Sequence, residues 1–264
     1  MSAPLLEVQE LSCRFGGLRA LDRVSFSVEP GEIFGLIGPN GAGKTTLFNL
    51  VTGLTPPSAG TVLWRGAAIS HLPPHRRNRL GLARTFQNLR LFDGLSVLEN
   101  LLVALQHQGR SSNLDGLLCT ARHRRAERQR LDTAWQLLEE LELTSLAERE
   151  AGTLAYGDRR RLEMARALAT DPSLLLLDEP AAGLNPSEKE ELCGLIQALR
   201  QRHQLTVMII EHHVPLLMRL CDRMAVLDFG VRIALGTPDQ VRRDPKVIEA
   251  YLGSGSGPGG QEEA

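Results

Sequence analysis

The sequence predicts an α/β fold that combines a parallel sheet, an antiparallel β subdomain at the N-terminus and a helical subdomain inserted in the middle of the chain. Nearly continuous apolar runs at residues 33–37, 173–177 and 205–210 are typical of parallel strands that are buried on both faces. Two segments near the N-terminus instead alternate apolar with polar residues, and residues 91–150 follow a helical period. These three patterns together define the fold class.

The alternating segments, residues 5–11 and 24–28, predict antiparallel strands with one buried face. Phe15 lies between them, beside two glycines that make the backbone flexible. Its ring is either a core residue at the edge of this small sheet or a surface on which an adenine ring could stack. The strand pair that precedes a phosphate-binding loop favours stacking.

A phosphate-binding pattern follows the apolar run 33–37 and precedes a predicted helix: Gly38-Pro39-Asn40-Gly41-Ala42-Gly43-Lys44-Thr45-Thr46. Its outer glycines lie five positions apart, and Lys-Thr follows the second one. Glycines allow backbone N–H groups to turn toward an anion, and the helix adds the positive end of its dipole. Lys44 is expected to reach the terminal phosphates, and the Thr45 hydroxyl to hold Mg²⁺. The alternative is a glycine-rich turn that only joins a strand to a helix.

Two carboxylates follow the apolar run 173–177, at the edge where open α/β sheets bind ligands. Asp178 is expected to hold Mg²⁺ or its water, and Glu179 to polarise a nucleophilic water. Acidic residues also end strands simply because the following loop is solvated. The phosphate-binding pattern in the same chain favours the catalytic interpretation.

Two further polar residues end predicted strands. Gln87 closes a short strand at 82–87, and its amide could reach a metal or an attacking water, although a solvated strand end is the simpler interpretation. His212 follows the strand at 205–210 and is expected to contact a γ-phosphate. Residues 224–228 and 232–235 complete the predicted strands.

The middle of the chain changes to helical periodicity, and we place a helical subdomain at roughly residues 91–170. Its apolar residues recur every three or four positions, at Leu95, Leu98, Leu101, Leu102 and Leu105 and again at Leu131, Trp135, Leu138 and Leu141. A loop is expected at 109–113. The strongly basic segment 122–130 is expected to be a solvated helix face, with a contact to an anion or a lipid headgroup as the alternative.

A second candidate anion site precedes the helix predicted at residues 159–170. The segment is Leu154-Ala155-Tyr156-Gly157-Asp158, and unpaired N–H groups collect where a helix begins.

Composition limits the remaining function classes. The chain has 264 residues and a net charge of −1, which gives no electrostatic reason to expect nucleic-acid binding. No apolar run approaches the ~18 residues of a membrane-spanning helix, so we expect a cytosolic chain. Its cysteines (Cys13, Cys119, Cys193 and Cys221) lack the spacing of a metal site or redox pair. The glycine-rich tail, residues 253–264, is expected to be disordered.

Taken in chain order, these motifs resemble those of the ATP-binding cassette family, and the resemblance covers essentially residues 5–252. The resemblance implies a single nucleotide-binding domain with a P-loop NTPase core of the RecA-like type. Within the family, residues 84–87, 99–104, 155–158 and 179–186 look like the larger ATPase subunit of bacterial branched-chain amino-acid importers. That subunit hydrolyses ATP to energise uptake through membrane permeases.

The resemblance implies a role for each matching residue. Phe15 matches the aromatic residue that stacks on adenine, and Gly38 to Thr46 match the phosphate cradle. Thr45 and Gln87 match the magnesium contacts. Glu179 matches the general base, and His212 the residue that clamps the γ-phosphate. Ala155, Tyr156, Gly157 and Asp158 match a signature that contacts ATP held by a second cassette.

The implied cofactors are ATP and Mg²⁺. The implied partners are an identical or related second cassette, membrane permeases and, indirectly, a periplasmic binding protein, with the chain peripheral to the cytoplasmic face of the inner membrane. The alternatives are a lipopolysaccharide-export ATPase and a non-transport regulatory ATPase of the same fold.

Three positions depart from the usual family pattern. Ala155-Tyr156 stands where most members have Ser-Gly, Asn185 replaces an aspartate, and His213 follows His212 where an aspartate is common.

Overall fold

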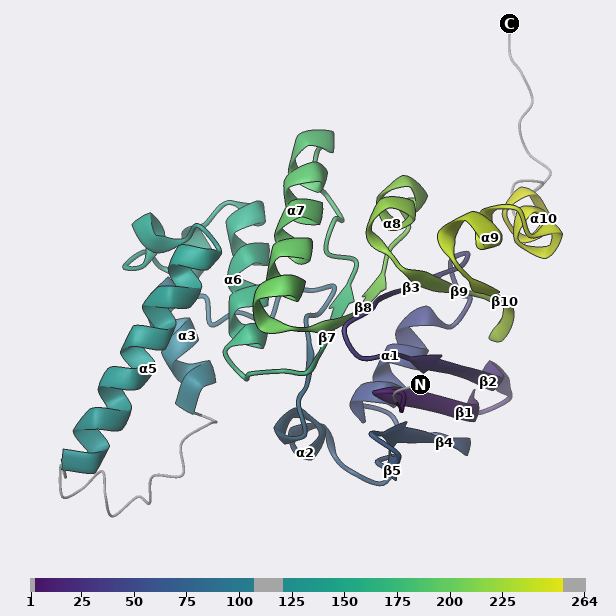
Figure 1. Cartoon of the computed structure of the whole chain (residues 1–264), viewed down its shortest axis with the longest axis horizontal. Helices are drawn as coiled ribbons and strands as arrows, with labels where there is room; N and C mark the ends of the chain where they lie inside the picture. Colours follow the sequence, from purple (N-terminus) through teal and green to yellow (C-terminus); the bar gives the residue numbers. More distant parts are fainter. Residues whose placement is uncertain (1–2, 107–120, 254–264) are drawn as a thin grey trace, which may run out of the picture. The chain divides into compact units, whose positions relative to one another are not determined.

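The computed structural model describes residues 3–106 and 121–253 (Figure 1). The loop expected at 109–113, Cys119 and residues 254–264 of the expected tail lie outside this range. The chain divides into two compact units. The first is formed by residues 1–74 and 206–264, and the second, residues 75–205, is inserted between these two segments.

The first unit contains an antiparallel sheet with the strand order β2-β1-β4-β5. Its strands are β1 (Leu6–Phe15), β2 (Leu18–Val28), β4 (Ala59–Trp64) and β5 (Ala67–Ala68). Leu6, Val8, Leu11 and Cys13 of β1 are buried, which confirms the alternating pattern. Both long strands exceed the predicted segments because register shifts after Val8 let the pairing continue to Phe15.

The same unit contains the strands expected from its continuous apolar runs. Strand β3 (Ile33–Ile37) pairs in parallel with β8 (Thr206–Ile210) and with β9 (Arg223–Asp228). Strand β10 (Val231–Gly236) pairs antiparallel with β9. Every residue of β3 and β8 is buried. The helices of this unit are α1 (Lys44–Thr52), α8 (Val214–Leu220), α9 (Pro238–Arg242) and α10 (Pro245–Gly253).

The second unit contains the parallel pair β6 (Leu82–Arg84) and β7 (Leu174–Asp178). The helices among its described residues are α2 (Pro74–Arg79), α3 (Val97–Leu105), α5 (Ala121–Glu140), α6 (Tyr156–Leu168) and α7 (Pro186–His203). Two short 3-10 helices span Thr144–Leu146 and Ala151–Thr153. Helix α3 packs against α5 and α6 (Figure 1).

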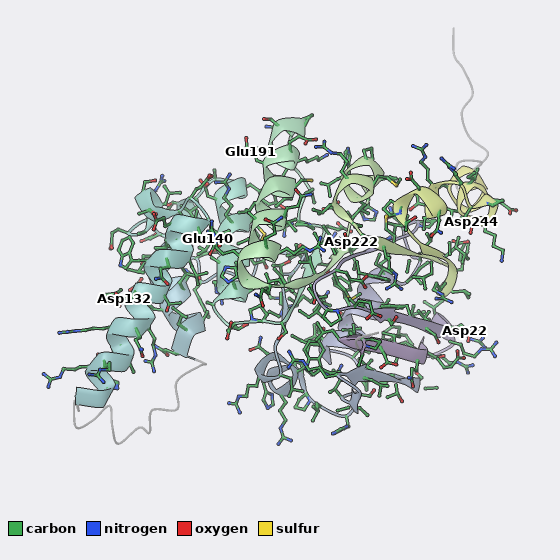
Figure 2. All side chains as sticks on the ribbon, in the orientation of Figure 1. Asp22, Asp132, Glu140, Glu191, Asp222 and Asp244 are labelled. Atoms are coloured by element: carbon green, nitrogen blue, oxygen red, sulfur yellow. The ribbon has the colours of Figure 1, made fainter. Side chains whose placement is uncertain are left out.

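Helix α5 bears out only part of the expected apolar stripe, since Leu138 is buried, and so is Leu141 just after the helix, while the first two members are exposed. Ala134, Leu137 and Leu138 are buried, whereas Leu131 and Trp135 are 40% and 37% exposed. The i, i+4 spacing of Leu131 and Trp135 fits a helix, but that spacing does not show which stripe faces the neighbouring helices. At the end of α5, the Glu140 carboxylate, labelled in Figure 2, accepts hydrogen bonds from Arg202 and His203 of α7 at 2.8 and 2.9 Å.

The expected helix starts require correction at two places. Helix α6 begins at Tyr156, not at residue 159, so the candidate anion segment forms its first turn. Helix α3 begins at Val97 because Ser96 and Glu99 form a capping box, which leaves Leu95 outside the helix. Among the described residues, no helix is both long and apolar enough to cross a membrane.

Candidate functional site

The phosphate-binding pattern forms the connection from β3 to α1, and two of its glycines have conformations and surroundings that exclude a side chain. Gly38 has φ +152°, and a Cβ there would overlap the Leu227 carbonyl oxygen of β9. Gly43 has φ +98°, and a Cβ there would lie 2.7 Å from the Ala20 carbonyl oxygen of β2. The loop therefore packs closely against two strands because glycines occupy these positions.

Lys44 is held inside this loop. Its side chain is 5% exposed, and Nζ donates hydrogen bonds to the carbonyl oxygens of Gly38 at 2.7 Å and Pro39 at 2.8 Å. Gly43 precedes α1 without a side-chain cap. The N–H groups of the first helical turn, the helix dipole and the Lys44 ammonium thus combine into a site suited to a polyphosphate.

The first unit carries the other residues proposed to meet a nucleotide. Phe15 is the last residue of β1 and is 51% exposed, so it is not the core residue of the alternative interpretation. Thr45 is exposed in the first turn of α1, and His212 is exposed directly after β8 and Glu211. All three keep their roles in nucleotide binding as predictions.

In the second unit, the structure brings Gln87 and Glu179 together. Gln87 Nε2 donates a hydrogen bond to Glu179 Oε2 at 2.8 Å. Glu179 has φ +51°, in the left-handed region that non-glycine residues rarely adopt. Strain of this kind concentrates at functional sites, where the surrounding structure imposes it. The Glu179 carboxylate is therefore both oriented by a neutral donor and placed on a strained backbone.

Asp178, the last residue of β7, is almost completely buried. Arg84 at the end of the neighbouring strand β6 donates from Nη2 to Asp178 Oδ2 at 2.7 Å, and the two side chains are 5% and 1% exposed. The other carboxylate oxygen, Oδ1, is buried and has no hydrogen-bond partner among the described residues. An unpaired anionic oxygen at a strand end fits Mg²⁺ or one of its waters, because Mg²⁺ prefers oxygen ligands. Asp178 therefore suits the metal role expected of it.

The candidate anion segment at the start of α6 has an open first turn. Ala155 precedes the helix with φ −59° and ψ 154° and makes no side-chain cap, and a Cβ on Gly157 would meet open space. Asp158 lies in the first turn, and Tyr156 is 44% exposed. The first turn of α6 is therefore exposed on the surface of the second unit.

Sequence reasoning missed three residues that support the site. Arg84 pairs with Asp178, Arg160 of α6 donates to the carbonyl oxygen of Gln87 at 2.9 Å, and Tyr251 of α10 hydrogen-bonds the backbone of Gly38. Of these three, only Arg84 could have been found from the sequence, because it is a basic residue in the predicted strand that leads to Gln87.

Comparison with known proteins gives a family for this combination of motifs. The model of the ABC transporter family matches residues 21–182. A second model, described as branched-chain amino acid ATP-binding cassette transporter, matches residues 231–256, which include β10 and α10.

Curated relatives match over almost the whole chain. The high-affinity branched-chain amino acid transport ATP-binding protein BraF of Pseudomonas aeruginosa is 50% identical over 96% of this chain and 99% of its own length. LivG of Escherichia coli K12, with the same description, is also 50% identical, over 96% of this chain and 99% of its own length. The lipopolysaccharide export system ATP-binding protein LptB of E. coli K12 is 38% identical over 94% of this chain and 97% of its own.

Solved structures show the same fold. A nucleotide-free ATP-binding cassette from an ABC transporter aligns with a TM-score of 0.82 at 33% identity, over 94% of this chain and 99% of that one. The ADP conformation of an ATP-binding cassette aligns with a TM-score of 0.81 at 32% identity, over 96% of this chain and 100% of that one.

Proposed function

This chain belongs to the ABC transporter family, and from that premise we propose that it is the ATP-hydrolysing subunit of an importer for branched-chain or related amino acids. Two relatives with that description share half of their residues with this chain across nearly its full length. The observation that supports hydrolysis best is the 2.8 Å hydrogen bond between Gln87 and Glu179. It gives the chain an oriented carboxylate at a strand end, where a general base is required.

In the proposed reaction, the loop from Gly38 to Thr46 binds the β- and γ-phosphates of ATP, and Lys44 turns its ammonium from the loop carbonyls toward them. Glu179 accepts a proton from the water that attacks the γ-phosphorus, and Gln87 holds that carboxylate in place. As the new P–O bond forms, the bond to the β–γ bridging oxygen breaks and ADP leaves with its electron pair, so the products are ADP and phosphate. His212 contacts the γ-phosphate, and the ring of Phe15 stacks on adenine. Thr45 of the first unit, and Gln87 and Asp178 of the second, would supply oxygen ligands for Mg²⁺, and the ion would contribute positive charge against the phosphates.

The assembly is part of the proposal. A second cassette, identical or related, presents its signature to the ATP held here, and residues Ala155 to Asp158 do the same for ATP on the partner. Motion of the paired cassettes then drives membrane permeases, to which a periplasmic binding protein delivers the amino acid. The chain lies at the cytoplasmic face of the inner membrane as a peripheral subunit.

Lipopolysaccharide export is the nearest alternative within transport. The curated relative with that function is 38% identical, against 50% for the branched-chain amino acid relatives, and this difference favours import. The relatives named above are described as ATP-binding proteins of transport or export systems, which favours a transporter subunit over a regulatory, non-transport ATPase.

The experiment is uptake by the reconstituted transporter. The chain is purified with the permeases and second cassette proposed to form its transporter, placed in vesicles with ATP inside, and supplied with labelled leucine and the binding protein. We expect ATP-dependent uptake that is lost in Lys44→Ala and kept in Lys189→Ala, a lysine change on α7 in the second unit. ATP-driven extraction of lipopolysaccharide without leucine uptake would support the alternative.

A further inference from the structure

A buried arginine holds the backbone that carries Gln87. Arg160 lies one turn into α6 and is 5% exposed. Its Nη1 donates to the Phe86 carbonyl oxygen and its Nη2 to the Gln87 carbonyl oxygen, each at 2.9 Å. Because one planar guanidinium spans two successive carbonyls, it restricts the rotation of the peptide between them.

The phenol of Tyr156 holds that guanidinium. Its oxygen accepts hydrogen bonds from Arg160 Nε at 3.1 Å and Nη2 at 2.7 Å, and the guanidinium carbon lies 5.2 Å from the ring centre. The pair has i, i+4 spacing on α6, so the helix itself keeps the two side chains adjacent. Tyr156 occupies a position where most cassettes have glycine, which has no side chain to make such a contact.

Glu163 neutralises the buried charge. It is 6% exposed, accepts the Phe86 N–H at 3.0 Å and lies 3.4 Å from Arg160 Nη1. Arg160 therefore has acceptors in three directions: the phenol, the two carbonyls and a carboxylate. A buried cation satisfied in this way rigidifies its surroundings.

The ring of Tyr156 also faces the turn that follows Glu179. Gly183 in that turn has φ +78°, and a Cβ added there would lie 3.4 Å from Tyr156 Cε1. Tyr156 thus lies beside the turn after Glu179 and reaches the backbone of Gln87 through Arg160. Gln87 and Glu179 are in turn joined by their own 2.8 Å hydrogen bond. All of these residues lie in the second unit.

We propose that Tyr156 and Arg160 are positioning residues for hydrolysis in their own subunit: the phenol fixes the guanidinium, the guanidinium fixes the Gln87 backbone, and Gln87 orients Glu179. The inference deepens the proposed function and rests on it for the reaction that it tunes. It gives the aromatic residue of this signature a role within the chain that carries it, in addition to the signature's contact with ATP on a second cassette.

The test compares ATP hydrolysis by the assembled transporter carrying Tyr156→Phe, Arg160→Lys or both. Tyr156→Phe keeps the ring against the Gly183 turn and removes the acceptor for Arg160. We expect kcat to fall about tenfold, as for the loss of a hydrogen bond to a charged group, with KM for ATP changed less than about twofold. Arg160→Lys should lower kcat at least as much, because an ammonium cannot span both carbonyls. The double variant should match Arg160→Lys, since both changes act through one contact.

Arg161→Lys is the matched control. Arg161 is the next residue of α6, but its guanidinium contacts Glu142 and, at 3.4 Å, Glu191 of α7, which is labelled in Figure 2. We expect its kcat to equal that of the parent. Amide hydrogen exchange of residues 84–92, measured without nucleotide, should be faster in Tyr156→Phe and Arg160→Lys and unchanged in Arg161→Lys.

Parental kcat in Tyr156→Phe would overturn the proposal. A fall in kcat that Arg161→Lys shares, or one that comes with a raised KM and unaltered exchange at 84–92, would overturn it as well. The parent and Glu179→Gln are assayed in parallel. If the parent itself does not hydrolyse ATP, the proposed function fails, and hydrogen exchange still tests the positioning contact separately.

Discussion

Gln87 and Glu179 are 92 positions apart in the sequence, yet Gln87 Nε2 lies 2.8 Å from Glu179 Oε2. They meet because Gln87 follows β6, Glu179 follows β7, and these two strands are parallel neighbours. An amide is suited to this place, since it donates a hydrogen bond to the carboxylate and cannot take up the proton that a general base accepts. We therefore expect the identity of residue 87 to influence the pH range in which Glu179 can act as the proposed base.

Replacing Gln87 with Glu should shift the pH dependence of hydrolysis. Two carboxylates at this distance disfavour the doubly ionised state, so the pKa of one of them rises. A base with a raised pKa is deprotonated only at higher pH, and the acidic limb of the kcat profile should move upward by about one pH unit or more. Gln87→Ala should lower kcat without moving that limb. Identical profiles for Gln87→Glu and the parent would contradict the interaction.

Removing Arg84 should destabilise the chain through Asp178. Arg84→Met leaves a carboxylate that is 1% exposed without its guanidinium, and we expect the free energy of unfolding to fall by about 3 kcal/mol. Adding Asp178→Asn should recover most of the loss, because the buried group is then neutral. Urea denaturation measures the free energy of unfolding of the single and double variants. Arg149→Met, which replaces an exposed arginine, is the control. Equal losses in the single and double variants would show that packing, not charge, dominates.

Because Glu179 has a left-handed backbone, we expect a residue with a side chain at this position to lower the free energy of unfolding relative to glycine. Glu179→Gly and Glu179→Ala both remove the carboxylate, but only glycine tolerates φ +51° without strain. We expect the glycine variant to be more stable than the alanine variant by about 1 kcal/mol in urea denaturation, with both inactive. A more stable alanine variant would mean that the left-handed conformation is not retained.

Glu163 predicts a pH dependence of stability. Burial raises the pKa of Glu163 above its ordinary value of 4.5. The Phe86 N–H and Arg160 lower that pKa, but burial is the larger effect. Protonated Glu163 therefore stabilises the fold fully below the ordinary pKa, and this contribution is lost as pH rises through the raised one. Glu163→Gln keeps an acceptor for Phe86 and does not titrate. Its free energy of unfolding, relative to the parent, should increase from about pH 4.5 to pH 8. A pH-independent difference would contradict the raised pKa.

The strands were the most predictable part of the fold. The runs at β3, β7 and β8 are apolar at nearly every position because both faces are buried, and that pattern leaves few alternatives. Helix starts and helix faces were less predictable. Helix α6 takes in the polar residues 156–158, and α5 buries Ala134 while exposing Trp135, because packing against neighbouring helices decides both.

The candidate site also contains residues that the sequence predicted and residues that it did not. Lys44, Asp178 and Glu179 follow from local spacing, since the loop and the strand end are each continuous in the sequence. Their supporting partners do not. Arg84 meets Asp178 across 94 positions and Arg160 meets the Gln87 carbonyl across 73, so only the folded chain reveals them. The assignment of Phe15 and His212 to nucleotide contacts stays a prediction.

The most direct measurement is a single turnover of ATP labelled at the γ-phosphate, followed in the assembled transporter with Mg²⁺. We predict that the parent releases labelled phosphate, that Glu179→Gln binds ATP with parental affinity and keeps it intact, and that Lys44→Ala fails to bind it. Phosphate release by Glu179→Gln at the parental rate would contradict the central claim that Glu179 activates the attacking water.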